Sequence, residues 1–290
     1  MRTNKEQNTC VDCFFGAVRH CSTAAKLEPT ALALVQTQEV VQEEIMISVI
    51  IPATNAEAHL AETLSSLVSA AVDGLVREVI VVDGGSTDRT LAIADDAGAD
   101  IVKADGGRGS QLRAGAARAR FPWLLFLDAD TLLDTGWERE VNLHIERVQS
   151  GRRRAEVASF RFQLDDEGAL PRTLEALVSL RARLLKLPYG DQGLLIPRAL
   201  YDQVGGFGAL PALEDMDLLR RIGRNRIAVL NSRAIVNGER YRRDGYLSHM
   251  ARGQLYLALY LIGVPVRTIA NLFGASPDPV GEPAVGRGAR

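Results

Sequence analysis

The stretch EVIVVDGGSTD, residues 78–88, decides the fold. Its first part, Glu78–Val82, is rich in β-branched residues, which is typical of a strand buried in a parallel sheet. An aspartate and two glycines end this run, and glycine lets the backbone turn sharply. The next segment, Thr87–Ala97, has helical spacing, with Ser86 as a candidate N-cap. A buried strand, a short turn and a helix in this order indicate a βαβ unit.

The same pattern recurs on both sides of this unit. Upstream, Ile47–Ile51 is another β-branched run, ended by Pro52, and Glu57–Ala71 carries leucines at helical spacing. Downstream, the expected elements are a strand at Asp100–Lys103, a helix at Ser110–Arg120 and a strand at Trp123–Leu127. Strands and helices alternating at this spacing predict an α/β fold with a mostly parallel central sheet flanked by helices. Ligands of such sheets bind at the carboxyl ends of the strands, so functional residues are expected there.

The second half of the chain is less regular. Glu156–Leu164 alternates like an edge or hairpin strand. The other expected elements are helices at Leu174–Leu187, Pro197–Val204 and Glu214–Arg224, strands at Gly193–Ile196 and Ile227–Leu230, and an apolar helix at Leu247–Ile262. Gly205 and Gly206 are expected to end the helix that Pro197 opens.

Composition and charge exclude several classes of protein. The 290 residues include 34 Lys and Arg and 36 Asp and Glu, a formal net charge of −2. Nucleic-acid-binding proteins usually carry a broad basic surplus, so no nucleic acid is expected as a partner. A hydrophobic content of 47% excludes a largely disordered chain. The three cysteines all lie within the first 21 residues, which excludes a disulfide framework and suits a reducing compartment.

Acidic side chains follow two of the expected strands. Asp128 and Asp130 come directly after the apolar run WLLFL, and a continuing strand would point both to the same face. Carboxylates suit Mg²⁺ or Mn²⁺, whose coordination substrate phosphates and water complete. Asp83 follows Val82, where an acid can accept hydrogen bonds from a ribose or a base. The alternative for Asp128 and Asp130 is a solvated acidic turn, and the alternative for Asp83 is a simple helix cap.

Five motifs, taken in order, resemble a family 2 glycosyltransferase with the GT-A nucleotide-diphospho-sugar fold. They are ISVIIPATNAE (47–57), VVDGGSTDRT (81–90), GRGSQLRAG (107–115), LLFLDADT (124–131) and ALEDMDLLRR (212–221). The resemblance covers about two-thirds of the chain, and five ordered motifs are far more specific than any one of them. GDQG at residues 190–193 also resembles the small bacterial subgroup found beside arsenosugar biosynthesis genes.

The resemblance implies a nucleotide-diphospho-sugar donor, most simply a UDP-sugar, and an acceptor hydroxyl. It implies that residues of the first three motifs hold the donor nucleotide, namely Pro52, Thr54, Asn55, Asp83, Arg108, Gln111 and Arg113. Asp128 would touch the ribose or the metal ion, and Asp130 would bind the Mg²⁺ or Mn²⁺ that bridges the diphosphate. Arg243, in a basic run, would contact the diphosphate.

The resemblance further implies single displacement with inversion at the anomeric carbon. Asp215 would act as general base on the acceptor hydroxyl, and Glu214 would orient the loop or bind the acceptor. The metal ion, with nearby arginine, would neutralise the leaving diphosphate. The alternative for Glu214–Asp217 is an acidic helix start that the helix dipole favours.

Two positions depart from the family's pattern. Ala56 stands where Glu usually follows Asn, with Glu57 one place later, and Arg113 stands where Asn is usual. Both departures leave the identity of the donor undetermined. Two alternative functions therefore remain. One is a nucleotide-sugar binding protein without transferase activity. The other is a sugar-phosphate nucleotidyltransferase, although PATNAEAHL (52–60) lacks the glycines of a phosphate loop.

Four parts follow from these patterns. Residues 46–243 would form the transferase domain, and residues 1–45 a poorly ordered extension or an over-called start before Met46. Residues 244–273 would carry the apolar C-terminal helix, and 274–290 a disordered tail. This helix would pack on the domain, form a homodimer contact or lie in a membrane interface. The loop Arg152–Arg154 is expected to be solvated, with an attraction to acidic lipid.

The longest uncharged apolar stretch near the C-terminus has 14 residues, 253–266, which is too short to cross a bilayer. A cytoplasmic protein is therefore expected, either free or at the inner face of the plasma membrane. The acceptor stays open among a small metabolite, a lipid, a carotenoid-like acid and a polysaccharide.

Overall fold

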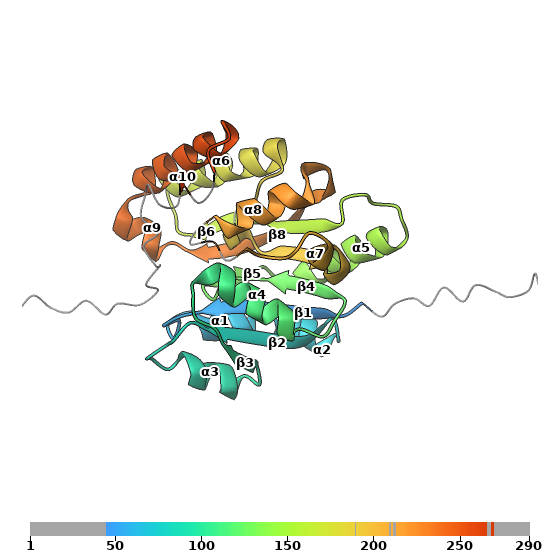
Figure 1. Cartoon of the computed structure of the whole chain (residues 1–290). Coiled ribbons are helices and arrows are strands. Elements are labelled where there is room, and N and C mark those ends of the chain that lie inside the picture. The colour runs from blue at the N-terminus through green and yellow to red at the C-terminus, as the bar shows by residue number, and fades with distance from the viewer. Residues whose placement is uncertain (1–44, 189, 209, 211–212, 266–267, 270–290) are drawn as a thin grey trace, which may run out of the picture. The chain divides into compact units, whose positions relative to one another are not determined.

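A computed structural model of the chain describes residues 45–188, 190–208, 210, 213–265 and 268–269 (Figure 1). The expected C-terminal tail and all but the last residue of the expected N-terminal extension lie outside these residues. The strands are β1 (Ile47–Ala53), β2 (Val76–Asp83), β3 (Asp100–Lys103), β4 (Trp123–Phe126), β5 (Thr131–Leu133), β6 (Val157–Asp165), β7 (Leu194–Pro197) and β8 (Ile227–Asn237). They form one sheet in the order β3-β2-β1-β4-β7-β6-β8-β5.

The helices connect and cover these strands. They are α1 (Leu60–Ser65), α2 (Val68–Val72), α3 (Thr90–Asp96), α4 (Arg108–Arg118), α5 (Trp137–Gln149), α6 (Ala169–Leu185), α7 (Arg198–Gln203), α8 (Glu214–Ile222), α9 (Glu239–Asp244) and α10 (Tyr246–Leu261), with the 3₁₀ turns η1 (Gly190–Gln192) and η2 (Arg224–Arg226). Buried side chains of α1, α2, α3 and α5 pack on one face of the sheet, and those of α4, α7 and α8 pack on the other.

The sheet is mixed, and its first half is parallel. β3, β2, β1 and β4 are parallel neighbours, whereas β7 runs antiparallel to both β4 and β6, and β5 antiparallel to β8. The predicted α/β class is confirmed. The expectation of an edge or hairpin strand at Glu156–Leu164 is wrong, because β6 lies between β7 and β8. Its alternation arises because Phe162 and Leu164 pack with α6, while Arg161 and Gln163 stay half-buried.

The central position of β1 explains its β-branched sequence. Val49 and Ile51 pack on one face of the sheet and Ile50 on the other, so the strand has no face in water. Pro52 belongs to β1 and pairs with Val82 of β2. On the side of β1 that faces β4, pairing ends at Ile50. No hydrogen bond between β1 and β4 therefore requires the N–H that Pro52 lacks.

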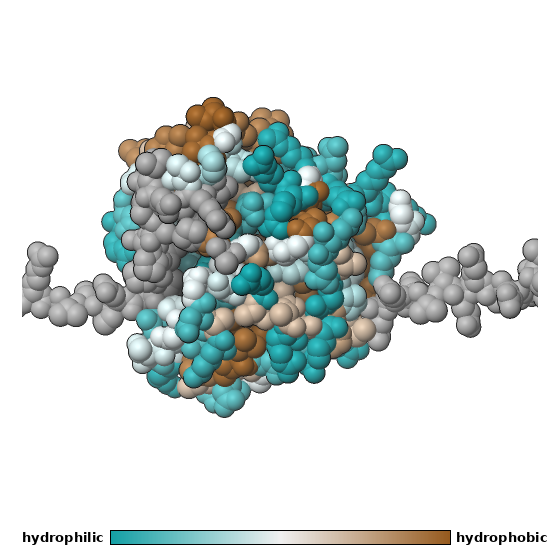
Figure 2. All heavy atoms as spheres, viewed as in Figure 1, coloured by the Kyte–Doolittle hydropathy of each residue, from teal (hydrophilic) through white to brown (hydrophobic). Residues whose placement is uncertain are grey.

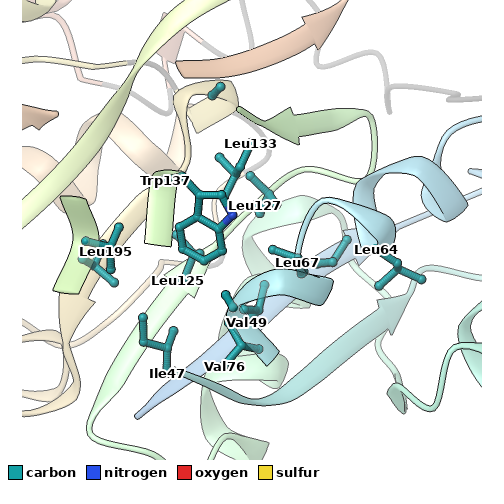
Figure 3. Packing of buried hydrophobic residues seen from close by; sticks show 14 of the residues in the cluster. Ile47, Val49, Leu64, Leu67, Val76, Leu125, Leu127, Leu133, Trp137 and Leu195 are labelled. Carbon is teal, nitrogen blue, oxygen red and sulfur yellow. The ribbon is translucent and has the colours of Figure 1, made fainter. Parts of the chain in front are cut away.

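A tryptophan fills the core between the sheet and the helices on one face. Figure 3 shows the Trp137 ring among leucines of β4, β5 and β7, with side chains of β1 and β2 below it. Its indole N–H donates to the carbonyl of Ser66 at 3.1 Å. This bond takes the Ser66 carbonyl away from the helical ladder, and the single helix expected at Glu57–Ala71 is observed as α1 and α2.

Another expectation needs correction. α3 begins at Thr90, and Ser86 is not its N-cap; the Ser86 hydroxyl accepts the backbone N–H of Asn55 instead. The apolar C-terminal helix, α10, packs on the domain along one side only, through the buried Leu257 and the partly buried Tyr246, Met250 and Tyr260. The helices in the described part of the chain all fall short of the length and hydropathy that crossing a membrane requires.

Candidate functional site

The loops that follow β1 and β2 are held together by side chains expected at a ligand site. Asn55 adopts the left-handed conformation, with φ of 50°. Its Oδ1 accepts the N–H of Thr87 at 2.9 Å. Asp83 is buried, and its Oδ1 accepts the N–H of Ser86 at 2.8 Å. Asn55 and Asp83 therefore give the DGGSTD turn its shape, as Asx-type bonds do in other turns.

The floor of the site is packed too tightly for any side chain at Gly84. A Cβ there would lie 2.2 Å from Gln111 Nε2 and 2.4 Å from Thr54 Oγ1. Gln111 is buried on α4 and donates to Thr54 Oγ1 at 3.2 Å and to the Ala53 carbonyl at 3.3 Å. The amide of Gln111 thus joins α4 to the end of β1, and Gly84 lets the β2 turn approach both.

Arg108 joins the acids that follow β4 to the acids that open α8. Its Nε and Nη2 donate to Asp128 Oδ1 at 3.1 and 2.6 Å, and its Nη1 donates to Glu214 Oε1 at 2.5 Å. Glu214 is buried, with 7% of its side chain exposed, and Asp128 and Arg108 are 21% and 30% exposed. Segments more than 100 residues apart in sequence therefore meet at one guanidinium.

The charges of this cluster act on one another. Burial disfavours the charged guanidinium of Arg108, but the carboxylates of Asp128, Glu214 and Asp215 outweigh it and raise the pKa of Arg108. Burial, followed by the negative charge of Glu214, raises the pKa of Asp215, against the opposing charges of Arg108 and Arg181. Asp215 is thus a carboxylate that binds a proton more readily than an exposed aspartate does.

The GDQG segment supports Asp215 from the other side. The backbone N–H of Gly190, in η1, donates to Asp215 Oδ2 at 2.7 Å. A Cβ at Gly190 would lie 2.8 Å from Arg108 Nη2, so this close approach requires glycine. Tyr241 of α9 reaches the same turn, with its hydroxyl donating to Asp191 Oδ2 at 3.2 Å.

Asp130 lies half-buried in the turn between β4 and β5. Its carbonyl accepts the N–H of Asn237 at 3.2 Å, which ties the turn to the end of β8. Within the described residues, no three His, Cys, Asp or Glu side chains converge as in an all-protein metal site. Mg²⁺ and Mn²⁺ commonly take one or two carboxylates and complete their shell with substrate phosphates and water. Asp130 and Asp128 fit such a site.

Arg113 and Arg243 make none of the contacts described so far. Arg113 is exposed on α4, and its charge acts on the Tyr201 hydroxyl of α7. Arg243 is 68% exposed on α9, with its Nε 3.1 Å from Asp244 Oδ1. Neither side chain joins the Arg108 cluster in this structure.

The departure at Ala56 has a local explanation. Ala56 is 2% exposed, and its N–H donates to Thr90 Oγ1 at 2.7 Å. Glu57 accepts the N–H of Arg89 just before α3, at 2.9 Å. The acid that the pattern places after Asn55 is therefore displaced by one residue, and it binds the backbone that leads into α3.

Sequence reasoning missed two residues of the site. The Gly190 N–H could have been suspected from GDQG, whose glycines follow a helix and precede a strand. Arg181 is 5% exposed in α6, at the apolar spacing of Leu174 and Val178. A charged residue among the apolar positions of α6 was the signal in the sequence that could have identified Arg181. Arg181 and Arg108 both favour the charged form of Asp215.

Taken together, these residues provide a buried carboxylate of raised pKa, an arginine beside it and two further acids, Asp128 and Asp130, between β4 and β5. The carboxylate of raised pKa suits proton abstraction, the arginine suits an anionic ligand, and the two further acids suit a hard cation.

Known proteins resemble this chain in sequence and in fold. The family model "Glycosyl transferase family 2" matches residues 48–210. Glycosyltransferase AglJ of Haloferax volcanii is 40% identical over 72 residues, 24% of this chain and 24% of that protein. Glucosyl-3-phosphoglycerate synthase of Mycobacterium tuberculosis is 37% identical over 95 residues, 30% of this chain and 29% of that protein. Each match spans less than a third of these relatives.

Solved structures show the fold. S. aureus TarS (residues 1–349) superimposes with a TM-score of 0.54 at 21% identity, over 67% of this chain and 60% of that chain. The M. tuberculosis glucosyl-3-phosphoglycerate synthase in complex with Mn²⁺, UDP and glucosyl-3-phosphoglycerate has a TM-score of 0.52 at 24% identity, over 76% and 81%. The predicted GT-A fold is confirmed by these likenesses.

Proposed function

The chain belongs to glycosyl transferase family 2, and from this premise we propose that it moves a sugar from a nucleotide-diphospho-sugar to an acceptor hydroxyl. We propose a UDP-sugar as the donor. The glucosyl-3-phosphoglycerate synthase of similar fold was solved with UDP and Mn²⁺, and TarS with UDP-GlcNAc, which supports this choice. The GDQG motif supports a place in the arsenosugar-associated subgroup.

The observation that carries the proposal is the cluster around Arg108. A guanidinium between Asp128 and Glu214 stands where the ends of β1, β2 and β4 direct a ligand. A nucleoside diphosphate carries the charge that this cation can bind bidentately. Binding would then exchange the carboxylate partners of Arg108 for phosphate oxygens.

Asp215 supplies the base in this proposal. Its carboxylate is oriented by the Gly190 N–H, and its pKa is raised by burial and Glu214. A raised pKa makes it a better acceptor for the proton that the acceptor hydroxyl loses as it attacks the anomeric carbon. One base acting on the face opposite the leaving diphosphate corresponds to single displacement with inversion.

Asp130 and Asp128 would hold the divalent ion, which would neutralise charge on the leaving diphosphate when bound. In this structure Asp128 is also bound by Arg108. A cytoplasmic location is part of the proposal, supported by the reducing-compartment composition of the chain.

A thermal-shift experiment with UDP, GDP, CDP and dTDP, each with and without Mn²⁺, tests the donor site. A ligand at a hundred times its Kd stabilises the folded state by about 2.7 kcal/mol. We expect a Mn²⁺-dependent rise in Tm with UDP that is lost in Asp130→Ala. The control Asp73→Ala removes an exposed acid after α2 and should keep the shift. No shift with any nucleotide would overturn the proposal.

Release of UDP from UDP-sugars then separates a transferase from a binding protein. Asp215→Asn keeps an oxygen for the Gly190 N–H but cannot accept a proton, so it should bind UDP normally and lose about 100-fold or more in turnover. Equal turnover in Asp215→Asn and wild type would remove Asp215 as the base. UDP binding without turnover in the wild type would support the binding-protein alternative.

A further inference from the structure

The helices α6 and α10 contact each other and expose a continuous set of apolar side chains. The exposed members, which we call the apolar face, are Leu170, Leu177, Leu180 and Leu184 of α6, and Leu247, Leu255, Leu261 and the adjoining Ile262 of α10. Leu184 is 71% exposed and Ile262 is 76% exposed. Figure 2 shows hydrophobic residues gathered at the top of the molecule, where Figure 1 places α10 beside α6.

The exposed side of both helices is mainly apolar. On α6 the four leucines recur at intervals of seven, three and four residues, which puts them on one side. On α10 the other exposed positions between Leu247 and Leu261 are Ser248, Ala251, Arg252, Gln254 and Ala258, and Arg252 is the charged one among them. A surface helix normally turns a charged side to water, so two neighbouring helices that both turn an apolar side outward indicate an interaction surface.

Two basic hollows adjoin the apolar face. The first, of about 640 Å³, is lined by Arg161, Arg172, Arg183 and Arg233, and by the carboxylate of Glu175. Leu180 of the apolar face also lines it. The second, of about 550 Å³, is lined by Arg153, Arg183, Lys186 and Arg224. Arg183 lines both, so they form one basic region around the C-terminal half of α6.

The charge of this region is opposite to that of the whole chain. The two hollows carry seven different cationic side chains, because Arg183 is shared, and the carboxylate of Glu175 already pairs with Arg172 at 2.8 Å. The chain as a whole has a formal charge of −2. Such a concentration of cations selects for an anionic partner.

We propose that the apolar face and the two basic hollows together dock the protein on an anionic lipid bilayer. The leucines would enter the boundary between headgroups and acyl chains, and the arginines beside them would bind lipid phosphates. A second copy is a poorer occupant. A two-fold dimer uses the same patch on both subunits, so it would bring the two Arg183 regions towards each other.

Vesicle flotation of the full chain tests the proposal. The protein should float with vesicles of mixed phosphatidylcholine and phosphatidylglycerol, and not with phosphatidylcholine alone. High salt should release it, because salt screens the attraction of exposed cations to the headgroups. Flotation with phosphatidylcholine alone to the same extent, or no flotation with the anionic mixture, would overturn the proposal.

Two variants probe the two components separately. Arg183→Glu should lower the partition coefficient about 30-fold, since each charge near an anionic surface changes it about fivefold. Leu180→Glu should lower it about tenfold or more, because a leucine side chain leaves the interface. The matched controls lie on α5: Arg139 is exposed, and Leu143 is 48% exposed against 54% for Leu180. Arg139→Glu and Leu143→Glu should bind like wild type.

Sedimentation equilibrium of the same proteins decides between lipid and a second copy. We expect a monomer in solution for the wild type. A wild-type dimer that Leu180→Glu dissociates would overturn the proposal and assign the face to a subunit contact. None of these measurements depends on sugar transfer, so failure here leaves the proposed function standing, and failure of the transferase tests leaves the docking surface standing.

Discussion

Arg108 shows how much of the site depends on a single residue. Its guanidinium lies at hydrogen-bond distance from Asp128 and Glu214. Its charge also lowers the pKa of Asp215, although burial and Glu214 outweigh this effect and the net shift is upward. Without this cation three acids would share one partly buried region, and like charges at short range disfavour ionisation. Arg108 therefore contributes to stability and to the protonation state of the proposed base.

Arg108→Met should lower the free energy of unfolding by about 3 kcal/mol, because it leaves the carboxylates of Asp128 and Glu214 without their shared cation. Urea unfolding measures this loss. The control Arg118→Met, at the other end of α4, removes a guanidinium that is 49% exposed and 3.6 Å from Asp100, and should lose less than about 1 kcal/mol. Equal losses in the two variants would show that the Arg108 cluster is not a buried ion pair.

The protonation state of Asp215 gives the same variant a second readout. Loss of Arg108 removes a charge that lowers the pKa of Asp215, so that pKa should rise further. A base must be deprotonated to act. As the pH is lowered, any remaining turnover should therefore be lost at a higher pH in the variant than in the wild type.

At the scale of elements, α4 sets the position of Arg108 by packing on the sheet. Gly115, in the middle of α4, lies against β1 and β2 with no room for a side chain. A Cβ there would be 2.4 Å from Ile50 Cγ2 and 2.8 Å from Val82 Cγ2. The helix backbone can approach the two strands only because this residue is glycine.

Gly115→Ala should therefore destabilise the protein, although alanine usually stabilises a helix by about 1 kcal/mol relative to glycine. Overpacking of about 2 kcal/mol outweighs that gain and leaves a net loss of about 1 kcal/mol. The shift of α4 should also weaken UDP binding, which a titration would detect. Ala117→Val enlarges an exposed residue of the same helix and should lose only about 0.5 kcal/mol of helix propensity. A stabilised Gly115→Ala would contradict the close packing.

At the scale of the whole molecule, the stability of the core depends on pH through a buried histidine. His144 of α5 is 1% exposed and lies edge-on to Trp123 of β4, with ring centroids 6.4 Å apart. Its Nε2 is 3.2 Å from the Glu156 carbonyl, so this nitrogen carries the proton of the neutral ring. Burial lowers the pKa of His144 from 6.5 to about 4.

The sign of the effect follows from this lowered pKa. Below pH 6.5 the unfolded chain protonates His144 and the folded chain does not, so stability is full above pH 6.5 and is lost as pH falls towards 4. The loss over this range amounts to about 3 kcal/mol. Carboxylates of lowered pKa, such as Glu78, are ionised in both states until pH falls near their ordinary value of 4.5.

His144→Phe should flatten the fall in stability between pH 7 and 4.5 by about 2–3 kcal/mol, because the ring no longer titrates. Urea unfolding at several pH values measures the slope for both proteins. Leu143→Gln changes an exposed neighbour on the same helix and should keep the wild-type slope. Parallel curves for wild type and His144→Phe would show that His144 is protonated in the folded state as well.

The sequence by itself determined the parallel half of the fold and placed candidate site residues at the carboxyl ends of its strands. The buried strands β1, β2 and β4 carry β-branched or apolar runs bounded by sharp turns, and Asp83 and Asp128 lie at the carboxyl ends of β2 and β4. These are local signals, because hydrophobic periodicity and turn formation depend on residues that are close together in the sequence. The acids Glu214 and Asp215 were found by motif order and not by any local pattern.

Only the tertiary structure decided which of these residues meet. The sequence does not show that Arg108 joins Asp128 to Glu214, that Gly190 holds Asp215, or that Arg113 and Arg243 lie outside the cluster. It also left open whether the last helix is buried, and α10 exposes Leu247, Leu255 and Leu261 while Leu257 is buried. Long-range contacts depend on how whole elements pack, and packing is a property of shapes brought together across the chain rather than of neighbouring residues.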